Sequence, residues 1–269
     1  MYDVSIILPT HNRAHLLARS IDSVLAQDFQ SFELVVVDDC STDGTADVVK
    51  AIKDSRVRYL PLVQQHGAAG ARNQGIAATT APLLAFQDSD DEWISGKLAA
   101  QLEVMKSYPG VGVVYSDMQR YLQNGDIKDF PAPDVESDAI VNPLTMRYCV
   151  ESIGIQSCLI RRNLLEKVSL ADGPFDIQLN ALEDLELFIR LSRVCQFRRI
   201  NKPLVRYHET DGISSDLSRL ARAHEMLLCK YQRELTTNKR FLAIQTMSIA
   251  WLFKAGREQS VAKPNLSVD

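Results

Sequence analysis

The chain has 269 residues, of which 46% are hydrophobic and 24% are charged, as in an ordinary folded protein. This length is enough to bury a sizeable core in one large or two small domains. The formal net charge of −4 argues against non-specific nucleic-acid binding, which requires a basic surface, so no nucleic-acid partner is expected.

Five scattered cysteines, with no CxxC pair, argue against a disulfide framework and against a zinc site. The N-terminal segment lacks the charged region, the long apolar region and the cleavage site of a signal peptide. No run of about 20 apolar residues predicts a transmembrane helix. The expected location is therefore the cytoplasm, where the thiols stay reduced.

The first 115 residues alternate strand-like and helix-like segments. Apolar, β-branched runs predict buried strands at 4–8 and 33–37, and further strands are predicted at 57–62, 83–86 and 111–115. Helical spacing of apolar residues predicts helices at 13–27, 45–52, 71–78 and 94–108, with 66–70 as a loop. This order predicts an α/β fold with a mostly parallel sheet and helices on both faces.

The pattern becomes weaker after residue 115. The segment 117–142 reads as a long loop or small excursion. Further along, we expect a strand at 155–161, a helix at 183–194, an extended segment at 197–207 broken near Pro203, and helices from 215 to about 256. The predicted organisation is a domain over 1–214, divided into halves 1–115 and 116–214, and a helical extension over 215–269.

Polar residues follow the predicted strands where those strands end. Ligands of parallel α/β sheets bind outside the carboxyl ends of the strands. The candidates on that rim are Pro9, Thr10, Asn12, Asp38, Asp39, Arg72, Asn73, Asp88, Ser89, Asp90, Asp91 and His208. Any one of them is weak support for a site, because surface loops are commonly polar. Their convergence on one rim is the stronger indication.

Asp88 and Asp90 form the most specific acidic cluster. Two carboxylates, two residues apart after a buried strand, can reach one hard cation such as Mg²⁺ or Mn²⁺. The alternative is a solvated acidic turn, with Asp91 serving as a helix cap. The preceding βα pattern favours the metal site.

Three other acidic or histidine positions stay ambiguous from the residues alone. Asp38 and Asp39 can form an Asx-type turn or bind a base or ribose. Glu183 and Asp184 suit a helix N-terminus through the macrodipole, and the same field would keep a general base ionised. His208 is as compatible with a packed or surface histidine as with a ligand.

Five ordered segments together carry a family resemblance: VSIILPTHNR, ELVVVDDCSTDGT, GAAGARNQGI, AFQDSDDEW and LEDLELFIRL. Residues 4–214 resemble the family 2 glycosyltransferases, which have the GT-A nucleotide-sugar-binding fold. The resemblance implies an inverting transfer of a sugar from a nucleoside diphosphate sugar to an acceptor hydroxyl. UDP-sugars are the default donors of that family, and thymidine or guanosine donors stay open.

The resemblance also implies a role for each matching residue. Around the nucleotide it places Pro9, Thr10, Asn12, Asp39, Arg72, Asp88 and Asp90. Asp90 is the expected principal ligand of Mn²⁺ or Mg²⁺, with Asp88 beside it and His208 as a late ligand. Asp184 is the expected catalytic base. Gln87 stands where a leucine is common in the family, a departure that we treat as minor.

The acceptor half is less determined. A glycan or a lipid-linked acceptor fits, in the synthesis of bacterial cell-surface polysaccharide, and Trp93 and Asp117 are candidates to contact it. The apolar run 241–253 has basic flanks, so it fits either a helix on the membrane surface or a helix packed on the protein or on a second subunit.

Two rival functions remain. A sugar nucleotidyltransferase would have a glycine-rich basic loop after the first strand, and none follows Pro9. A non-catalytic sugar-nucleotide-binding or scaffold protein would have lost the metal or base carboxylates, which are present here. A peripheral membrane contact and a homo-oligomer both stay open.

Overall fold

A computed structural model of the chain describes residues 2–133, 153–210, 216–235, 250 and 253–255. These residues divide into two compact units. The first unit comprises Met1–Ile177 and Glu183–Glu209, and the second comprises Gln178–Leu182 and Thr210–Asp269. The predicted domain boundary after residue 214 falls outside the described residues.

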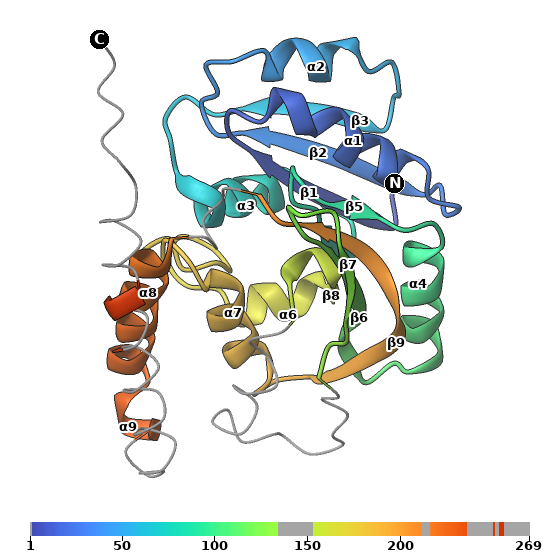
Figure 1. Ribbon diagram of the computed structural model, residues 1–269. Coiled ribbons are helices and arrows are strands. Elements are labelled where there is room, and N and C mark those ends of the chain that lie inside the picture. Colours follow the sequence, from blue (N-terminus) through green and yellow to red (C-terminus); the bar gives the residue numbers. More distant parts are fainter. Residues whose placement is uncertain (1, 134–152, 211–215, 236–249, 251–252, 256–269) are drawn as a thin grey trace, which may run out of the picture. The chain divides into compact units, whose positions relative to one another are not determined.

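The N-terminal half of the first unit has the predicted strand–helix alternation (Figure 1). Its parallel strands are β1 (Val4–Thr10), β2 (Phe32–Asp38), β3 (Val57–Pro61) and β4 (Leu83–Phe86), in the order β3-β2-β1-β4. The helices between and after them are α1 (Ala14–Leu25), α2 (Thr45–Ala51), α3 (Gly67–Ala77) and α4 (Lys97–Ser107). The carboxyl ends of β1, β2 and β4 therefore lie at one edge of the sheet.

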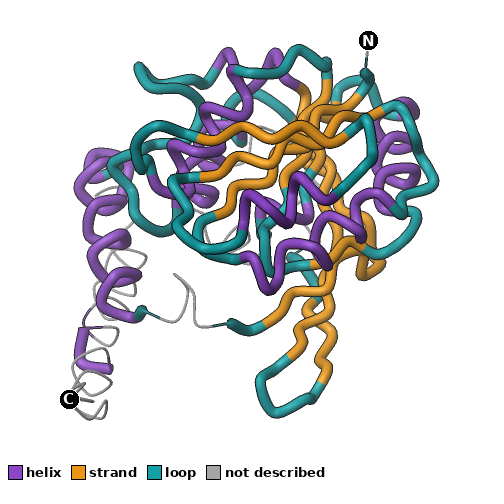
Figure 2. Tube along the Cα trace, turned by 90° about the horizontal axis from the view of Figure 1, so that it is seen from above, coloured by secondary structure: helices purple, strands orange, loops and turns teal. Residues whose placement is uncertain are grey.

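The sheet continues beyond β4 with strands of both directions. Next in order come β8 (Leu159–Arg161), β6 (Val111–Tyr121), β9 (Gln196–His208) and β5 (Glu92–Trp93), while β7 (Ile127–Phe130) pairs with β6. β8 is antiparallel to β4 and β6, whereas β9 is parallel to β6 and antiparallel to β5. The α/β expectation is confirmed, and the sheet is mixed and strongly twisted (Figure 2).

The segment after residue 115 differs from the sequence prediction. β6 runs on to Tyr121 and turns into β7, so the loop expected over 117–142 is wrong for its first part, and 134–142 lies outside the described residues. The predicted strand 155–161 is a short 3₁₀ helix, η1 (Ile155–Ser157), followed by β8. The break expected near Pro203 is a register irregularity where Asp117 pairs with it.

α3 also begins earlier than predicted. The sequence predicts a small-residue loop over 66–70, but Gly67–Gly70 is the first turn of the helix. Its two glycines are weak helix formers, whereas its two alanines favour a helix. Gly75, later in the same helix, is explained by its packing against the sheet. A Cβ there would lie 2.5 Å from Ile7 Cγ2 and 2.9 Å from Val37 Cγ2, so the helix approaches the sheet closely only with glycine.

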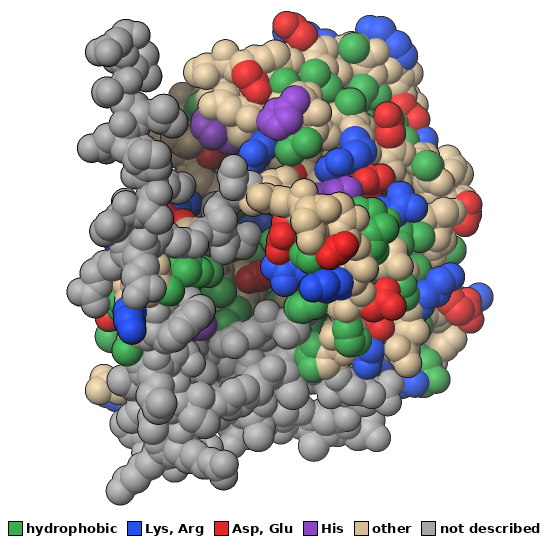
Figure 3. Space-filling model, in the orientation of Figure 1, with side chains coloured by type: hydrophobic (Ala, Val, Ile, Leu, Met, Phe, Trp, Pro, Cys, Tyr) green, Lys and Arg blue, Asp and Glu red, His purple; other side chains and the backbone are tan. Residues whose placement is uncertain are grey.

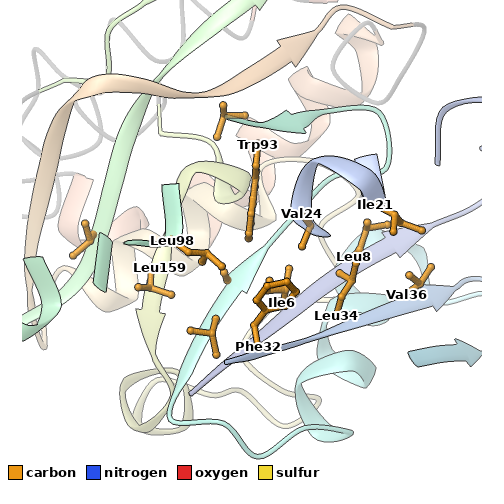
Figure 4. Close-up of a cluster of buried hydrophobic side chains, with 14 of the residues drawn as sticks. Ile6, Leu8, Ile21, Val24, Phe32, Leu34, Val36, Trp93, Leu98 and Leu159 are labelled. Atoms are coloured by element: carbon orange, nitrogen blue, oxygen red, sulfur yellow. The ribbon is translucent and has the colours of Figure 1, made fainter. Parts of the chain in front are cut away.

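The two faces of the sheet are covered by different helices. Ile6 and Leu8 of β1 belong to a core cluster with Ile21 and Val24 of α1, and Figure 4 shows these side chains packed together. Ile7 points to the opposite face, towards α3. The alternation of side chains along a strand thus places helices on both faces, as predicted.

The remaining described helices belong to both units. α6 (Arg162–Lys167) follows β8, and α7 (Glu183–Leu191) precedes β9. The second unit contains α8 (Leu217–Lys230) and α9 (Gln232–Leu235), as expected for the extension. The apolar run 241–253 lies almost wholly outside the described residues. Within the described part of the chain, no helix combines the length and apolarity needed to cross a bilayer.

Lys97 at the start of α4 is fully buried and gives a prediction about stability. Its Nζ lies 2.8 Å from Gln101 Oε1 and 4.0 Å from the centre of the Trp93 ring. Burial lowers the pKa of Lys97 to about 7, so the unfolded chain binds more protons than the folded one between about pH 7 and 10.5. We expect Lys97→Met to raise the free energy of unfolding at pH 7 by about 2–4 kcal/mol.

This advantage should shrink as the pH rises towards 10.5, because deprotonating the lysine of the unfolded chain, whose pKa is 10.5, then costs less free energy. Urea denaturation at pH 7 and at pH 9.5 measures it. Lys106→Met, at an exposed position of the same helix, is the matched control and should change neither value by much. An equal effect of Lys97→Met at both pH values would contradict this account.

Candidate active site

The end of β1 and the loop after β2 form the first part of the candidate site. Thr10 is 3% exposed, and its Oγ1 is buried without a hydrogen-bond partner among the described residues. Its carbonyl accepts a hydrogen bond from Asp39 N at 2.9 Å. Asn12 Oδ1 accepts one from Thr42 N at 2.8 Å. The structure therefore brings Thr10, Asn12 and Asp39 together, as predicted from the strand ends.

The two adjacent aspartates after β2 have different roles. Asp38 Oδ1 accepts from Ser41 N at 2.9 Å, which is the turn that the sequence left open. The Asp39 carboxylate accepts from His66 N at 2.7 Å and from Gly67 N at 2.8 Å. It therefore holds the start of α3, where free N–H groups and the helix dipole favour an anion.

Backbone strain is concentrated beside the predicted site residues. The non-glycine residues with positive φ in the described part of the chain are Asn12 at 52°, Cys40 at 64° and Leu182 at 61°. Cys40 follows Asp39, and Leu182 directly precedes Glu183. Such conformations are costly for side chains and tend to persist at functional sites. These three residues lie after β1, after β2 and directly before α7. Each of these segments contains predicted site residues, so the backbone supports the site independently of side-chain chemistry.

Arg72 of α3 is the centre of the second part of the site. It is 5% exposed, and its guanidinium donates to Asp88 Oδ1 at 2.8 Å and to Glu183 Oε1 at 2.7 Å. Burial alone would lower the pKa of Arg72, but the Asp88 and Glu183 carboxylates raise it. The ion pairs join the end of β4 to the start of α7, segments that the sequence alone did not connect.

The acidic loop after β4 is held through its backbone by α1. Arg19 donates to the Asp90 carbonyl at 2.6 Å, and Ser20 Oγ donates to the Asp88 carbonyl at 2.8 Å. Neither residue was singled out from the sequence. Ser20 did carry a signal, because it is a polar residue on the apolar stripe of an amphipathic helix, beside Leu17 and Ile21.

Gln87, treated as a minor departure from a common leucine, is fully buried. Its Nε2 donates to Ser20 Oγ at 3.0 Å and to the Asp91 carbonyl at 2.7 Å. A leucine could make neither bond. The substitution therefore changes how this chain fixes its acidic loop.

Asp91 does not cap α4, whose N-cap is Gly96. It is 1% exposed, and its two oxygens accept from His208 N at 2.9 Å and from Gln156 Nε2 at 2.9 Å. Burial and the charges of Asp88 and Asp90 raise the pKa of Asp91 well above its usual range. Asp91 thus ties the acidic loop to β9 and to η1.

His208 stands beside this loop at the end of β9. Its Nε2 lies 2.7 Å from Glu92 Oε1, and its ring is stacked at 4.9 Å from Tyr121. Burial lowers the pKa of His208, and the hydrogen bond to Glu92 opposes that shift. A metal-ligand role for His208 would have to use Nδ1 or a rotated ring, and it stays a prediction.

Asp184 has the pKa required of a general base near neutral pH. Burial raises its pKa to about 7, Glu183 adds to the rise, and Arg72 opposes it. Its Oδ1 accepts from Leu185 N at 2.7 Å, inside the first turn of α7. A carboxyl that titrates near the working pH can both be ionised and accept a proton efficiently. Perturbed pKa values of this kind are frequent at functional sites.

The carboxylates after β4 fit a divalent cation. Burial raises the pKa of Asp88, Arg72 opposes that rise, and the neighbouring Asp90 charge adds to it. No three His, Cys, Asp or Glu side chains in the described ranges are grouped around a common point. Mg²⁺ is commonly held by one or two carboxylates plus substrate phosphates, so this pair is sufficient.

The two residues considered for acceptor contact are structural in the part of the chain described. Trp93 is 3% exposed and donates from Nε1 to the Gln156 carbonyl at 3.1 Å. Asp117 is 6% exposed and makes a bidentate ion pair with Arg199, at 2.7 and 2.9 Å. The packing interpretation of Trp93 is therefore the better one. On the face in Figure 3, acidic and basic side chains lie interspersed.

Comparison with known sequences identifies relatives of this chain. A family model described as Glycosyl transferase family 2 matches residues 5–168. The chain is 32% identical, over 200 residues, to a UDP-Glc:α-D-GlcNAc-diphosphoundecaprenol β-1,3-glucosyltransferase of Escherichia coli. That match covers 74% of each protein. The family model spans Thr10, Asp39, Arg72, Asp88 and Asp90 and ends before Asp184.

Solved structures share the fold at lower identity. S. aureus TarS 1-349 in complex with UDP-GlcNAc has a TM-score of 0.67 and 21% identity, and the match covers 94% of this chain and 72% of the TarS 1-349 chain. A mannosyltransferase from Pyrobaculum calidifontis, in complex with GDP-Man and Mn²⁺, has a TM-score of 0.65 and 20% identity. That match covers 99% of this chain and 76% of the mannosyltransferase.

Proposed function

Because the chain belongs to glycosyltransferase family 2, we propose that it transfers a sugar, with inversion, from a nucleoside diphosphate sugar to an acceptor hydroxyl. The observation that carries the proposal is the Arg72 bridge. It joins Asp88, on the rim where donors are expected, to Glu183, whose neighbour Asp184 titrates near pH 7. A donor-side acid and a candidate base thus lie around one guanidinium.

Asp184 is the proposed base. Its carboxylate would take the proton of the acceptor hydroxyl as that oxygen attacks the anomeric carbon opposite the leaving group. The configuration of the anomeric carbon inverts because the acceptor oxygen bonds, in a single displacement, to the face opposite the leaving group. General-base assistance is worth roughly 10²–10⁴-fold in rate, and a pKa near 7 suits a reaction at neutral pH.

The donor would lie along the ends of β1, β2 and β4. Thr10 has a buried hydroxyl without a protein partner, which suits a contact to the nucleoside. Pro9, Asn12 and Asp39 complete this proposed nucleoside end, with Arg72 and Asp88 on the ribose and diphosphate side. A UDP-sugar is the proposed donor, supported by the relative named for UDP-Glc and by the similar fold that holds UDP-GlcNAc.

Asp90 and Asp88 are the proposed ligands of Mn²⁺ or Mg²⁺. When bound, such a cation would stabilise the negative charge that develops on the departing nucleoside diphosphate. Arg19 and Ser20 hold the backbone of this loop, which supports the positions from which both carboxylates extend. The similar fold that contains GDP-Man and Mn²⁺ supports the use of a metal.

The proposed acceptor is a lipid-linked sugar of bacterial polysaccharide assembly. The E. coli relative is named for an acceptor with a diphosphoundecaprenol group. Such an acceptor would bring the enzyme to the cytoplasmic side of a membrane as a peripheral protein. The family match supports this transferase function over a sugar nucleotidyltransferase.

A donor screen tests the proposal. Purified protein is mixed with a panel of nucleotide sugars in Mn²⁺, Mg²⁺ or EDTA, with calorimetric affinity and released diphosphate as readouts. Metal-dependent binding of one donor with slow hydrolysis is the expected result. Failure to bind any donor under all conditions would favour the non-catalytic scaffold.

A further inference from the structure

The carboxylate beside the proposed base has a partner that no local sequence pattern reveals. Glu183 Oε1 accepts from Arg72 at 2.7 Å, and the other end of the guanidinium donates to Asp88 at 2.8 Å. The side chains of Arg72 and Glu183 are only 7% and 12% exposed. At this degree of burial, water screens an ion pair less than it does at an open surface.

The Arg72 guanidinium is held on several sides. Its centre lies 5.5 Å from the ring of Phe175, which itself packs edge-on against Phe86. Its Nε is buried and has no hydrogen-bond partner among the described residues. Without Glu183, Asp88 would be the one ion-pair partner left to Arg72 among the described contacts. The position of the guanidinium therefore depends on Glu183.

Around the Asp184 carboxyl, the neighbouring carboxylates outnumber the cations. Four groups face the Asp184 carboxyl: Glu183 from its own helix, Arg72 from α3, Asp88 from the loop after β4, and the Cys158 thiol from the segment between η1 and β8. Arg72 is the one cation among them. A displaced guanidinium would leave Asp184 next to uncompensated negative charge.

We propose that Glu183 is a positioning residue that holds Arg72 between Asp88 and Asp184, so that one guanidinium serves the donor side and the acceptor side together. This inference rests on the proposed function. Glu183 itself touches neither substrate in this proposal. It acts through the side chain that it fixes.

Two variants separate the negative charge of Glu183 from its hydrogen bond to Arg72. Glu183→Gln keeps an oxygen for Arg72 but removes the negative charge that raises the Asp184 pKa. We expect the Asp184 titration to move down by about 0.5–1 pH unit, and the acid limb of the kcat/KM profile to move with it. Glu183→Ala releases Arg72, so kcat should fall about tenfold or more, and Glu183→Gln should recover most of that loss.

The titration is followed by NMR on protein labelled with ¹³C at aspartate carboxyls, with the Asp184 signal assigned by Asp184→Asn. This readout needs no turnover. Both variants remove the negative charge, but only Glu183→Ala releases Arg72, so the Asp184 titration should lie higher in Glu183→Ala than in Glu183→Gln. That difference without any sugar transfer by the wild type would leave the positioning role intact and overturn the proposed function. Normal transfer with the same Asp184 titration in both variants, or with wild-type kcat in Glu183→Ala, would overturn the positioning role alone.

Glu186→Gln is the matched control. Glu186 lies on the same helix, is fully buried, and pairs with Arg190 at 2.5 Å. Losing this ion pair should lower the melting temperature without moving the Asp184 titration. An equal pH shift in both variants would mean that any weakening of α7 has this effect, and would contradict a specific role of Glu183.

Discussion

Asp184→Asn is expected to reduce kcat for sugar transfer by about 10²–10⁴-fold while leaving donor affinity unchanged. Asparagine has nearly the same shape and can still accept the hydrogen bond from Leu185 N, but it cannot take a proton. Initial rates at saturating donor and acceptor, beside calorimetric donor affinity, measure the effect. Near-normal turnover by this variant would remove Asp184 from the role of base.

The same variant should not lose stability, which separates a catalytic defect from unfolding. The folded-state pKa of Asp184 is about 7, above the usual value of a carboxyl, so folding favours its protonated form. That contribution is present at low pH and is lost as the pH rises through about 7. Asparagine does not titrate, so the variant does not lose stability in this way as the pH rises. The difference in unfolding free energy, variant minus wild type, should therefore increase from pH 5 to pH 8.

The wild-type enzyme should show the matching pH dependence. Because the base must be ionised, kcat/KM should fall about tenfold per pH unit below the pKa near 7. The raised pKa results first from burial and second from Glu183. A catalytic group is thereby adjusted at a cost in folding stability, as is common at active sites.

The fold near β1–β4 could be predicted because its information is local. β1, β2 and β4 are mostly apolar and mostly buried. Thr10 and Asp38 end their strands and Asp88 follows β4 closely, whereas Arg72 and Asn73 lie within α3. Sheet topology then places those strand ends at one edge without knowledge of any contact. The predicted neighbours Thr10, Asn12 and Asp39 are therefore close in the structure.

The β6–β7 hairpin could not be predicted by the same rule. The exposed residues Ile127, Lys128 and Asp129 of β7 show no alternation of apolar and polar side chains. β7 pairs with the far end of β6 alone, so its sequence need not carry a buried-strand pattern. Periodicity reports burial, and a strand with little burial gives little signal.

Contacts between distant segments were the other limit. Arg72 and Glu183 are 111 positions apart, and nothing near either residue indicates the other. Trp93 is the opposite case, because the sequence suggested it for the site and tertiary packing places it in the core. Beside a predicted site an aromatic residue suggests sugar stacking, but Trp93 pairs with the core position Val205 of β9. Residue type and chain position identified the candidates, and tertiary packing decided their roles.

Asp90→Ala is expected to remove the stimulation of donor binding by Mn²⁺, so that donor affinity in Mn²⁺ equals that in EDTA. Changes in residues that merely support a ligand typically cost 10–100-fold in metal affinity, so loss of a direct ligand should cost at least about that much. Calorimetric titrations of the donor, with Mn²⁺ and with EDTA, measure it. Asp129→Ala, an exposed carboxylate on β7, is the matched control and should behave as wild type.

Asp88→Asn should give a different result, because the two carboxylates are not equivalent. Asp88 already binds Arg72 through its carboxylate, whereas Asp90 accepts the hydrogen bond of Arg19 through its backbone carbonyl. Asp88→Asn should therefore weaken donor binding in EDTA as well as in Mn²⁺, since it also loosens Arg72. If Asp90→Ala kept full metal stimulation while Asp88→Asn lost it, the principal ligand would be Asp88, and the assignment of Asp90 would be wrong.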